Sequence, residues 1–137
     1  MNPDCTHIIL IAEDDPDDRE LIAFAFAKVD PLLKLYIVNN GMEALDYLQK
    51  TTSDNLPCVI ILDYNMPELN GSQVLQQLSP DQRFQHIPKV ILSTSSNPQY
   101  IKDCLEKGAD AYRVKPHDFN ELMRVVAEMA DLCKRAA

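Results

Sequence analysis

The chain has 137 residues, a length that fits one domain because folding at this size buries roughly two-thirds of the unfolded chain's surface. Its 21 acidic and 13 basic residues give a formal net charge of -8, which disfavours direct contact with nucleic acid or with an anionic membrane surface. No apolar run is long enough to cross a membrane, and residues 1–7 lack the basic region of a signal peptide, so the sequence predicts a cytoplasmic protein.

Strand and helix patterns alternate along the chain. In chain order, the predicted elements are a strand over 8–12, a helix over 16–29, a strand over 34–38, a helix with Ala44, Leu45 and Leu48 on one face, a strand over 58–62, a helix with Val74, Leu75 and Leu78 on one face, a strand beginning near Lys89, a helix over 98–107, a strand over 109–114 and a last helix opening at Asp118. Gly108 follows the fourth helix, at a position that commonly adopts the left-handed conformation.

Five strand and helix units with short connections predict right-handed crossovers and a parallel sheet covered by helices on both faces. The fold class is therefore α/β, a doubly wound five-stranded parallel sheet with strand order 2-1-3-4-5. Ligands bind such sheets beyond the carboxyl ends of the strands, at the point where the strand order reverses. In this order that point lies between the first and third strands.

Polar side chains follow the predicted strands directly. They are Glu13 and Asp14 after the first strand, Asp63 after the third, Ser93 and Thr94 after the fourth, and Lys115 after the fifth. The predicted topology brings these residues to one edge of the sheet although they are far apart in sequence. Three carboxylates, hydroxyls and an ammonium at one edge can hold a divalent cation and a phosphoryl group.

The acidic residues at this edge require a compensating charge. Two carboxylates about 4 Å apart repel by roughly 4 kcal/mol at an effective dielectric constant near 20, so Glu13, Asp14 and Asp63 should either raise their pKa values or bind a cation. Oxygen ligands of this kind favour Mg²⁺ or Mn²⁺ over zinc. Asp15, Asp17 and Asp18 are instead interpreted as a solvated helix start, where acidic residues suit the helix dipole.

The cysteines at positions 5, 58, 104 and 133 show no pair with CxxC spacing. The spacing therefore supports neither a zinc site nor a redox motif. The four residues are expected to be buried thiols.

The sequence resembles the receiver domain of bacterial two-component response regulators over nearly its whole length. The matching pieces are the acidic pair Glu13-Asp14, Asp63 within LDYNMPELNG, Thr94 within LSTSS, and Lys115-Pro116 preceded by GADAY. Each piece alone is weak evidence, but together they follow the family's order and spacing. The loop from Leu78 to Lys89 resembles that of receivers that act as phytochrome partners.

The resemblance implies a flavodoxin-like or CheY-like fold and a role for each of these residues. Asp63 would accept a phosphoryl group from the phosphohistidine of a histidine kinase. Asp14, Asp63 and the main-chain carbonyl of Asn65 would coordinate Mg²⁺, with Glu13 helping directly or through a water. In the family pattern Thr94 would hydrogen-bond the phosphoryl oxygens, Lys115 would pair with them, and Tyr112 would report the phosphorylated state through its rotamer. The family pattern also implies a cis bond at Lys115-Pro116.

Other interpretations of these residues remain open. Lys115 could be a surface lysine, Thr94 could cap the following helix, and Tyr112 could be an ordinary half-buried tyrosine. A phosphatase of the haloacid dehalogenase type would need an aspartate where Asn65 stands, and no phosphate-binding glycine motif is present. A receiver that is never phosphorylated and acts only by binding is the main alternative.

The expected organisation is a single receiver domain over 1–137 without an effector domain, and without enzymatic function beyond self-phosphorylation from small donors and slow autodephosphorylation. Its expected partners are a cognate histidine kinase or phosphotransfer protein and a downstream protein or a second copy. Phosphorylation would alter a surface formed by the fourth helix, the fifth strand and the fifth helix.

Overall fold

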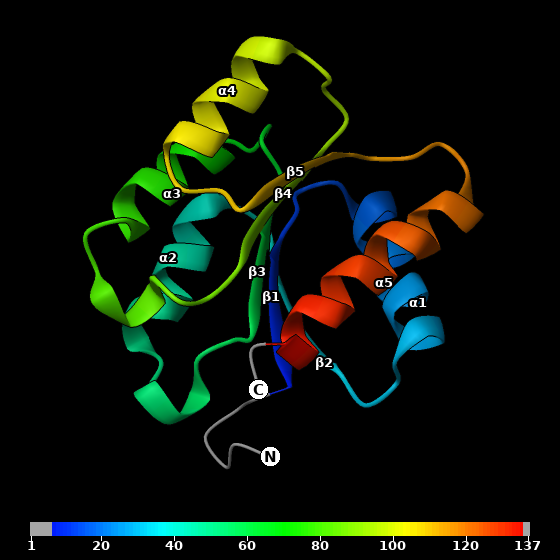
Figure 1. Cartoon of the computed structure of the whole chain (residues 1–137), viewed down its shortest axis with the longest axis horizontal. Coiled ribbons are helices and arrows are strands. Elements are labelled where there is room, and N and C mark those ends of the chain that lie inside the picture. Colours follow the sequence, from blue (N-terminus) through cyan, green and yellow to red (C-terminus); the bar gives the residue numbers. More distant parts are fainter. Residues whose placement is uncertain (1–6, 136–137) are drawn as a thin grey trace.

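The computed structural model describes residues 7–135 and contains a five-stranded parallel sheet (Figure 1). The strands are β1 (Ile8–Ala12), β2 (Lys34–Val38), β3 (Val59–Leu62), β4 (Lys89–Ser93) and β5 (Ala111–Val114). Their order in the sheet is β2-β1-β3-β4-β5, so the predicted fold class and strand order are confirmed. The reversal of strand order lies between β1 and β3, as expected.

Helices cover both faces of this sheet (Figure 1). The helices are α1 (Pro16–Val29), α2 (Gly41–Lys50), α3 (Gly71–Leu78), α4 (Pro98–Glu106) and α5 (Phe119–Arg135), with short 3-10 turns at Ser53–Asn55 and Gln82–Phe84. α1 and α5 lie on one face, and α2, α3 and α4 lie on the other. Within residues 7–135, no helix is long and apolar enough to cross a membrane.

Successive side chains of the central strands point to opposite faces of the sheet, and this alternation produces two separate cores. In β3, Ile60 and Leu62 contribute to the core under α2, α3 and α4, whereas Val59 and Ile61 contribute to the core under α1 and α5. All four side chains are buried, which explains why the strand is apolar throughout. A polar residue at the end of such a strand is therefore held rigidly by packing on both faces.

Local sequence determines where several helices begin and end. The Asp15 carboxylate accepts hydrogen bonds from the backbone N–H groups of Asp17 and Asp18 at the start of α1, next to Pro16. Asn70 and Gln73 form a reciprocal capping box at the start of α3. Gly108 has φ +114° after α4, which confirms the predicted left-handed position.

Two smaller predictions about the chain are wrong. β5 begins at Ala111 rather than Ala109, because the Ala109 N–H still donates to the Cys104 carbonyl of α4 at 3.0 Å. The bond between Lys115 and Pro116 is trans, since no peptide bond within 7–135 is cis.

The prediction of buried free thiols is correct for Cys104 and wrong for Cys58 and Cys133. Cys104 is free and buried, whereas Cys58 and Cys133 form a disulfide. Their sequence separation of 75 matches no motif, because only the packing of α5 near the start of β3 brings them together. Cys5 lies outside the described residues.

Candidate functional site

The carboxyl ends of β1, β3 and β5 bring Glu13, Asp63 and Lys115 into direct contact. The Lys115 ammonium donates to the Asp63 Oδ2 atom at 3.1 Å and also forms an ion pair with the Glu13 carboxylate. It further donates to the Asp18 Oδ2 atom of α1 at 2.8 Å. Only 10% of the Lys115 side chain is exposed, so this cation is shared among three carboxylates in a partly desolvated site.

Backbone hydrogen bonds orient the two buried carboxylates. The Asp15 N–H donates to the Glu13 Oε2 atom at 3.2 Å, and the Asn65 N–H donates to the Asp63 Oδ1 atom at 3.2 Å. Gly71, where the loop after β3 enters α3, has no room for a side chain, because an added Cβ would lie 2.8 Å from the Asp63 carbonyl oxygen. The loop that follows Asp63 therefore folds closely against it.

Burial and neighbouring charges change the ionisation of two groups in the site. Burial raises the pKa of Glu13 to about 7; the hydrogen bond from Lys115 opposes this rise, and the negative charge of Asp63 adds to it. Burial would lower the pKa of Lys115, but hydrogen bonds to Asp18 and Glu13 and the charge of Asp63 outweigh it and raise the pKa overall. The lysine is therefore charged at neutral pH.

An acidic pocket that can bind a metal ion is present at the same edge of the sheet. One carboxylate oxygen from each of Glu13, Asp14 and Asp63 lies within 4.8 Å of the others. Asp14 is exposed, so the pocket is open to solvent on one side. Three hard oxygen donors fit a small divalent cation such as Mg²⁺ or Mn²⁺, and the open side leaves room for water or phosphoryl oxygens.

The remaining predicted residues make other contacts than those that the resemblance implies. Asn65 is exposed, and its N–H rather than its carbonyl is engaged with Asp63. Thr94 is exposed, and its hydroxyl makes no hydrogen bond to any residue within 7–135. Tyr112 packs its ring against the core under α2, α3 and α4 and donates its hydroxyl hydrogen to the Ser95 carbonyl at 2.7 Å.

One residue of the site was missed by reasoning from the sequence. Asp18 was interpreted as part of a solvated helix start, yet it contacts Lys115; its place in the acidic first turn of α1, close to the end of β1, was the available signal. Ser93 is the last residue of β4 and is fully buried, and its carbonyl accepts the Lys115 N–H at 2.6 Å. The pair Ser93-Thr94 offers two hydroxyls, and the resemblance to the family assigned the phosphoryl contact to the second.

Comparisons with known proteins agree with this geometry. A family model of the response regulator receiver domain matches residues 9–127. The chain is 31% identical over 126 residues to the probable methanogenesis regulatory protein FilR2 of Methanothrix harundinacea, which covers 90% of this chain and 81% of that protein. It is 35% identical over 121 residues to the response regulator Rre1 of Synechocystis, which covers 88% of this chain and 50% of that protein.

Solved structures of response regulators, one of them a phytochrome response regulator, are also similar. The phosphorylated cyanobacterial regulator RcpA has a TM-score of 0.85 and 29% sequence identity, covering 96% of each chain. The Mn²⁺-bound form of the regulator Rcp1 has a TM-score of 0.76 and 27% identity, covering 88% of this chain and 89% of that one. The expected resemblance to regulators that work with phytochromes is thus confirmed.

Proposed function

The chain belongs to the response regulator receiver domain family of two-component systems, and we propose that Asp63 is its phosphoacceptor. The observation that carries this proposal is the contact between the Asp63 carboxylate and the Lys115 ammonium inside a three-carboxylate pocket. Phosphoryl transfer has a loose transition state that mainly needs alignment and neutralisation of charge. Asp63 would supply the nucleophilic oxygen and form an acyl phosphate, and Lys115 would neutralise the phosphoryl oxygens.

The metal that receiver domains bind in this acidic pocket would supply the remaining positive charge. We propose Mg²⁺, held by Asp14, Asp63 and the Asn65 carbonyl, with Glu13 bound directly or through a water. The proximity of the three carboxylates supports this assignment. When bound, the ion would supply positive charge that neutralises the phosphoryl oxygens during transfer to Asp63.

The donor and the output follow from the same proposal. A histidine kinase or a phosphotransfer protein of the cytoplasm would phosphorylate Asp63, and the response would pass to a downstream protein or a second copy through α4, β5 and α5. The net charge of -8 makes nucleic acid and anionic membranes unfavourable direct partners. The chain would act as a single receiver domain and a phosphoacceptor, not as a conventional enzyme.

Contacts between the pocket and α4 support this route of output. Tyr64, directly after Asp63, stacks on Tyr100 of α4 with ring centroids 4.4 Å apart. Tyr112 of β5 is hydrogen-bonded to the loop that precedes α4. Charge-assisted hydrogen bonds from Lys115 and a loop hydroxyl to the phosphoryl group, at roughly 1.5 to 3 kcal/mol each, would give about 3 to 6 kcal/mol. Because a change from 1:99 to 99:1 needs about 5.5 kcal/mol, we expect a partial shift of this surface.

Incubation with a small acyl phosphate and Mg²⁺ should add one phosphoryl group to the chain, as measured by intact mass. Excess chelator should prevent the addition, because the cation neutralises charge in the transition state. Hydroxylamine should remove the group, since it cleaves acyl phosphates. A phosphoryl group that forms equally well in chelator, or that resists hydroxylamine, would contradict the proposal.

Ser93 and Thr94 should differ in their effect on the response of α4 to a phosphoryl group. We predict that Thr94→Ala weakens the change at α4, because the variant lacks the hydroxyl that would hydrogen-bond to the phosphoryl group. Ser93→Ala is the matched control, since it removes a hydroxyl from the adjacent residue. Hydrogen exchange of 98–106 with beryllofluoride and Mg²⁺ measures the response. A loss of response in Ser93→Ala alone would assign the role to the buried hydroxyl instead.

A further inference from the structure

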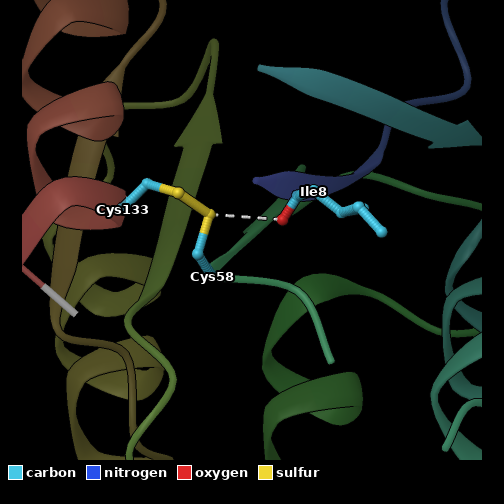
Figure 2. Close-up of a disulfide and its surroundings, with 3 residues drawn as sticks. All are labelled: Ile8, Cys58 and Cys133. Atoms are coloured by element: carbon cyan, nitrogen blue, oxygen red, sulfur yellow. Dashed lines mark hydrogen bonds between the residues drawn. A yellow bond between two sulfur atoms is a disulfide. The ribbon is translucent and has the colours of Figure 1, made fainter. Parts of the chain in front are cut away.

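We propose that Cys58 and Cys133 form a reversible thiol–disulfide site that controls how firmly the C-terminal end of α5 is held to the sheet. Cys58 directly precedes β3, and Cys133 lies in the last turn of α5 (Figure 2). Their Cα atoms are 4.9 Å apart, within the range that a disulfide requires. Since β3 ends at Asp63, the bond joins α5 to the strand that carries the proposed phosphoacceptor.

The surroundings of the pair suit the reduced form as well as the oxidised form. Both residues are buried, at 6% and 2% exposure, within the apolar core under α1 and α5. The Cys58 sulfur lies 3.3 Å from the Ile8 carbonyl oxygen (Figure 2). A disulfide sulfur has no hydrogen to donate, whereas a reduced Cys58 thiol can donate to this oxygen. Reduction therefore leaves two small apolar side chains, one of which can form a hydrogen bond, and their sulfur atoms must move apart to van der Waals contact.

The reaction is exchange with a small-molecule disulfide such as oxidised glutathione. One protein thiolate attacks that disulfide, forms a mixed disulfide and releases one small thiol. The second protein thiolate then displaces the other small thiol, so the protein loses two electrons and two protons and the reagent gains them. Because both sulfurs are buried, the exchange requires transient opening of the last turn of α5. In the cytoplasm proposed above, disulfides are generally transient or redox-sensing rather than permanent.

The bond would affect the output surface through α5. The chain segment that it closes, residues 58–133, contains Asp63, Thr94, Lys115, α4, β5 and all of α5 except its last two residues. In the oxidised form the end of α5 is fixed covalently to the start of β3, and in the reduced form only side-chain packing holds it. This step rests on the proposed function: oxidation should reduce the movement of α5 that follows phosphorylation.

Redox titration of the full chain tests the site independently of phosphorylation. The protein is equilibrated in glutathione buffers of different ratio, quenched with acid, and alkylated in denaturant. Intact mass should change from four adducts in reducing buffer to two in oxidising buffer, since the chain has four cysteines and Cys58 and Cys133 would pair with each other. Cys5→Ser should keep this change of two adducts, and Cys58→Ser should lose it. Four adducts at every ratio, or two that persist in excess reductant, would overturn the proposal.

Stability and hydrogen exchange test the consequence for α5. Reduction should lower Tm by roughly 10 °C, because the closed chain segment is long. It should also increase exchange of 126–135 at least tenfold in unphosphorylated protein, and Cys133→Ser should behave as reduced protein in either buffer. With beryllofluoride and Mg²⁺, the change in α5 should be smaller in the oxidised form. Equal changes in both forms would overturn the link to output, whereas no response to beryllofluoride in either form would contradict the proposed function instead.

Discussion

Replacing Asp63 with asparagine should abolish phosphoryl uptake from a small acyl phosphate. The amide is close to the carboxylate in size, so the loop that folds against residue 63 should be retained. However, the amide lacks the anionic oxygen that would attack phosphorus, and it weakens the bond to Lys115. We expect the phosphorylated fraction, measured by intact mass after incubation with donor and Mg²⁺, to fall below detection.

A matched substitution distinguishes loss of the acceptor from a general effect of charge. Asp46→Asn removes one carboxylate from the exposed surface of α2, where Asp46 is paired with Lys50. This variant should be phosphorylated like the parent, because it lies outside the pocket. Uptake that continues in Asp63→Asn would show that another residue is the acceptor, and peptide mapping would then identify it.

The sequence was sufficient to predict where the buried carboxylates lie. An apolar run that stops abruptly at Glu13 or Asp63 marks the end of a central strand, and parallel topology places such ends at one edge of the sheet. The strand order followed from the number of units and the preference for right-handed crossovers. These predictions depend on patterns that are only a few residues long and can be identified directly in the sequence.

Contacts between distant elements could not be predicted in the same way. Asp18 reaches Lys115 across 97 residues, and its acidic neighbours Asp15 and Asp17 gave the same local pattern without making that contact. The disulfide between Cys58 and Cys133 depends on how α5 packs, which no spacing encodes. At the end of β4 the sequence offers two adjacent hydroxyls, and a difference of one residue in the strand end determines which is buried.

Replacing Lys115 with methionine should destabilise the metal-free protein by about 3 to 5 kcal/mol at pH 8. Methionine fills much of the same space, but it leaves Glu13 and Asp63 without their compensating cation in a site that is largely buried. Mg²⁺ should recover more stability in this variant than in the parent, because the ion can neutralise the same carboxylates. Urea unfolding with chelator or with Mg²⁺ measures both effects, and Lys50→Met, which changes an exposed lysine, should stay within about 0.5 kcal/mol of the parent.

The stability lost in Lys115→Met should depend on pH, and the ionisation of Glu13 sets the direction of this dependence. Burial raises the pKa of Glu13 to about 7 in the parent, and removal of the Lys115 hydrogen bond should raise it further. The folded protein therefore holds a proton on Glu13 that the unfolded chain releases above the ordinary glutamate pKa of 4.5. The stability from this proton is fully present below that value and is lost as pH rises through the folded pKa. Lys115→Met should consequently cost less stability at pH 5 than at pH 8, and an equal cost at both values would show that Glu13 does not share the charge of Lys115.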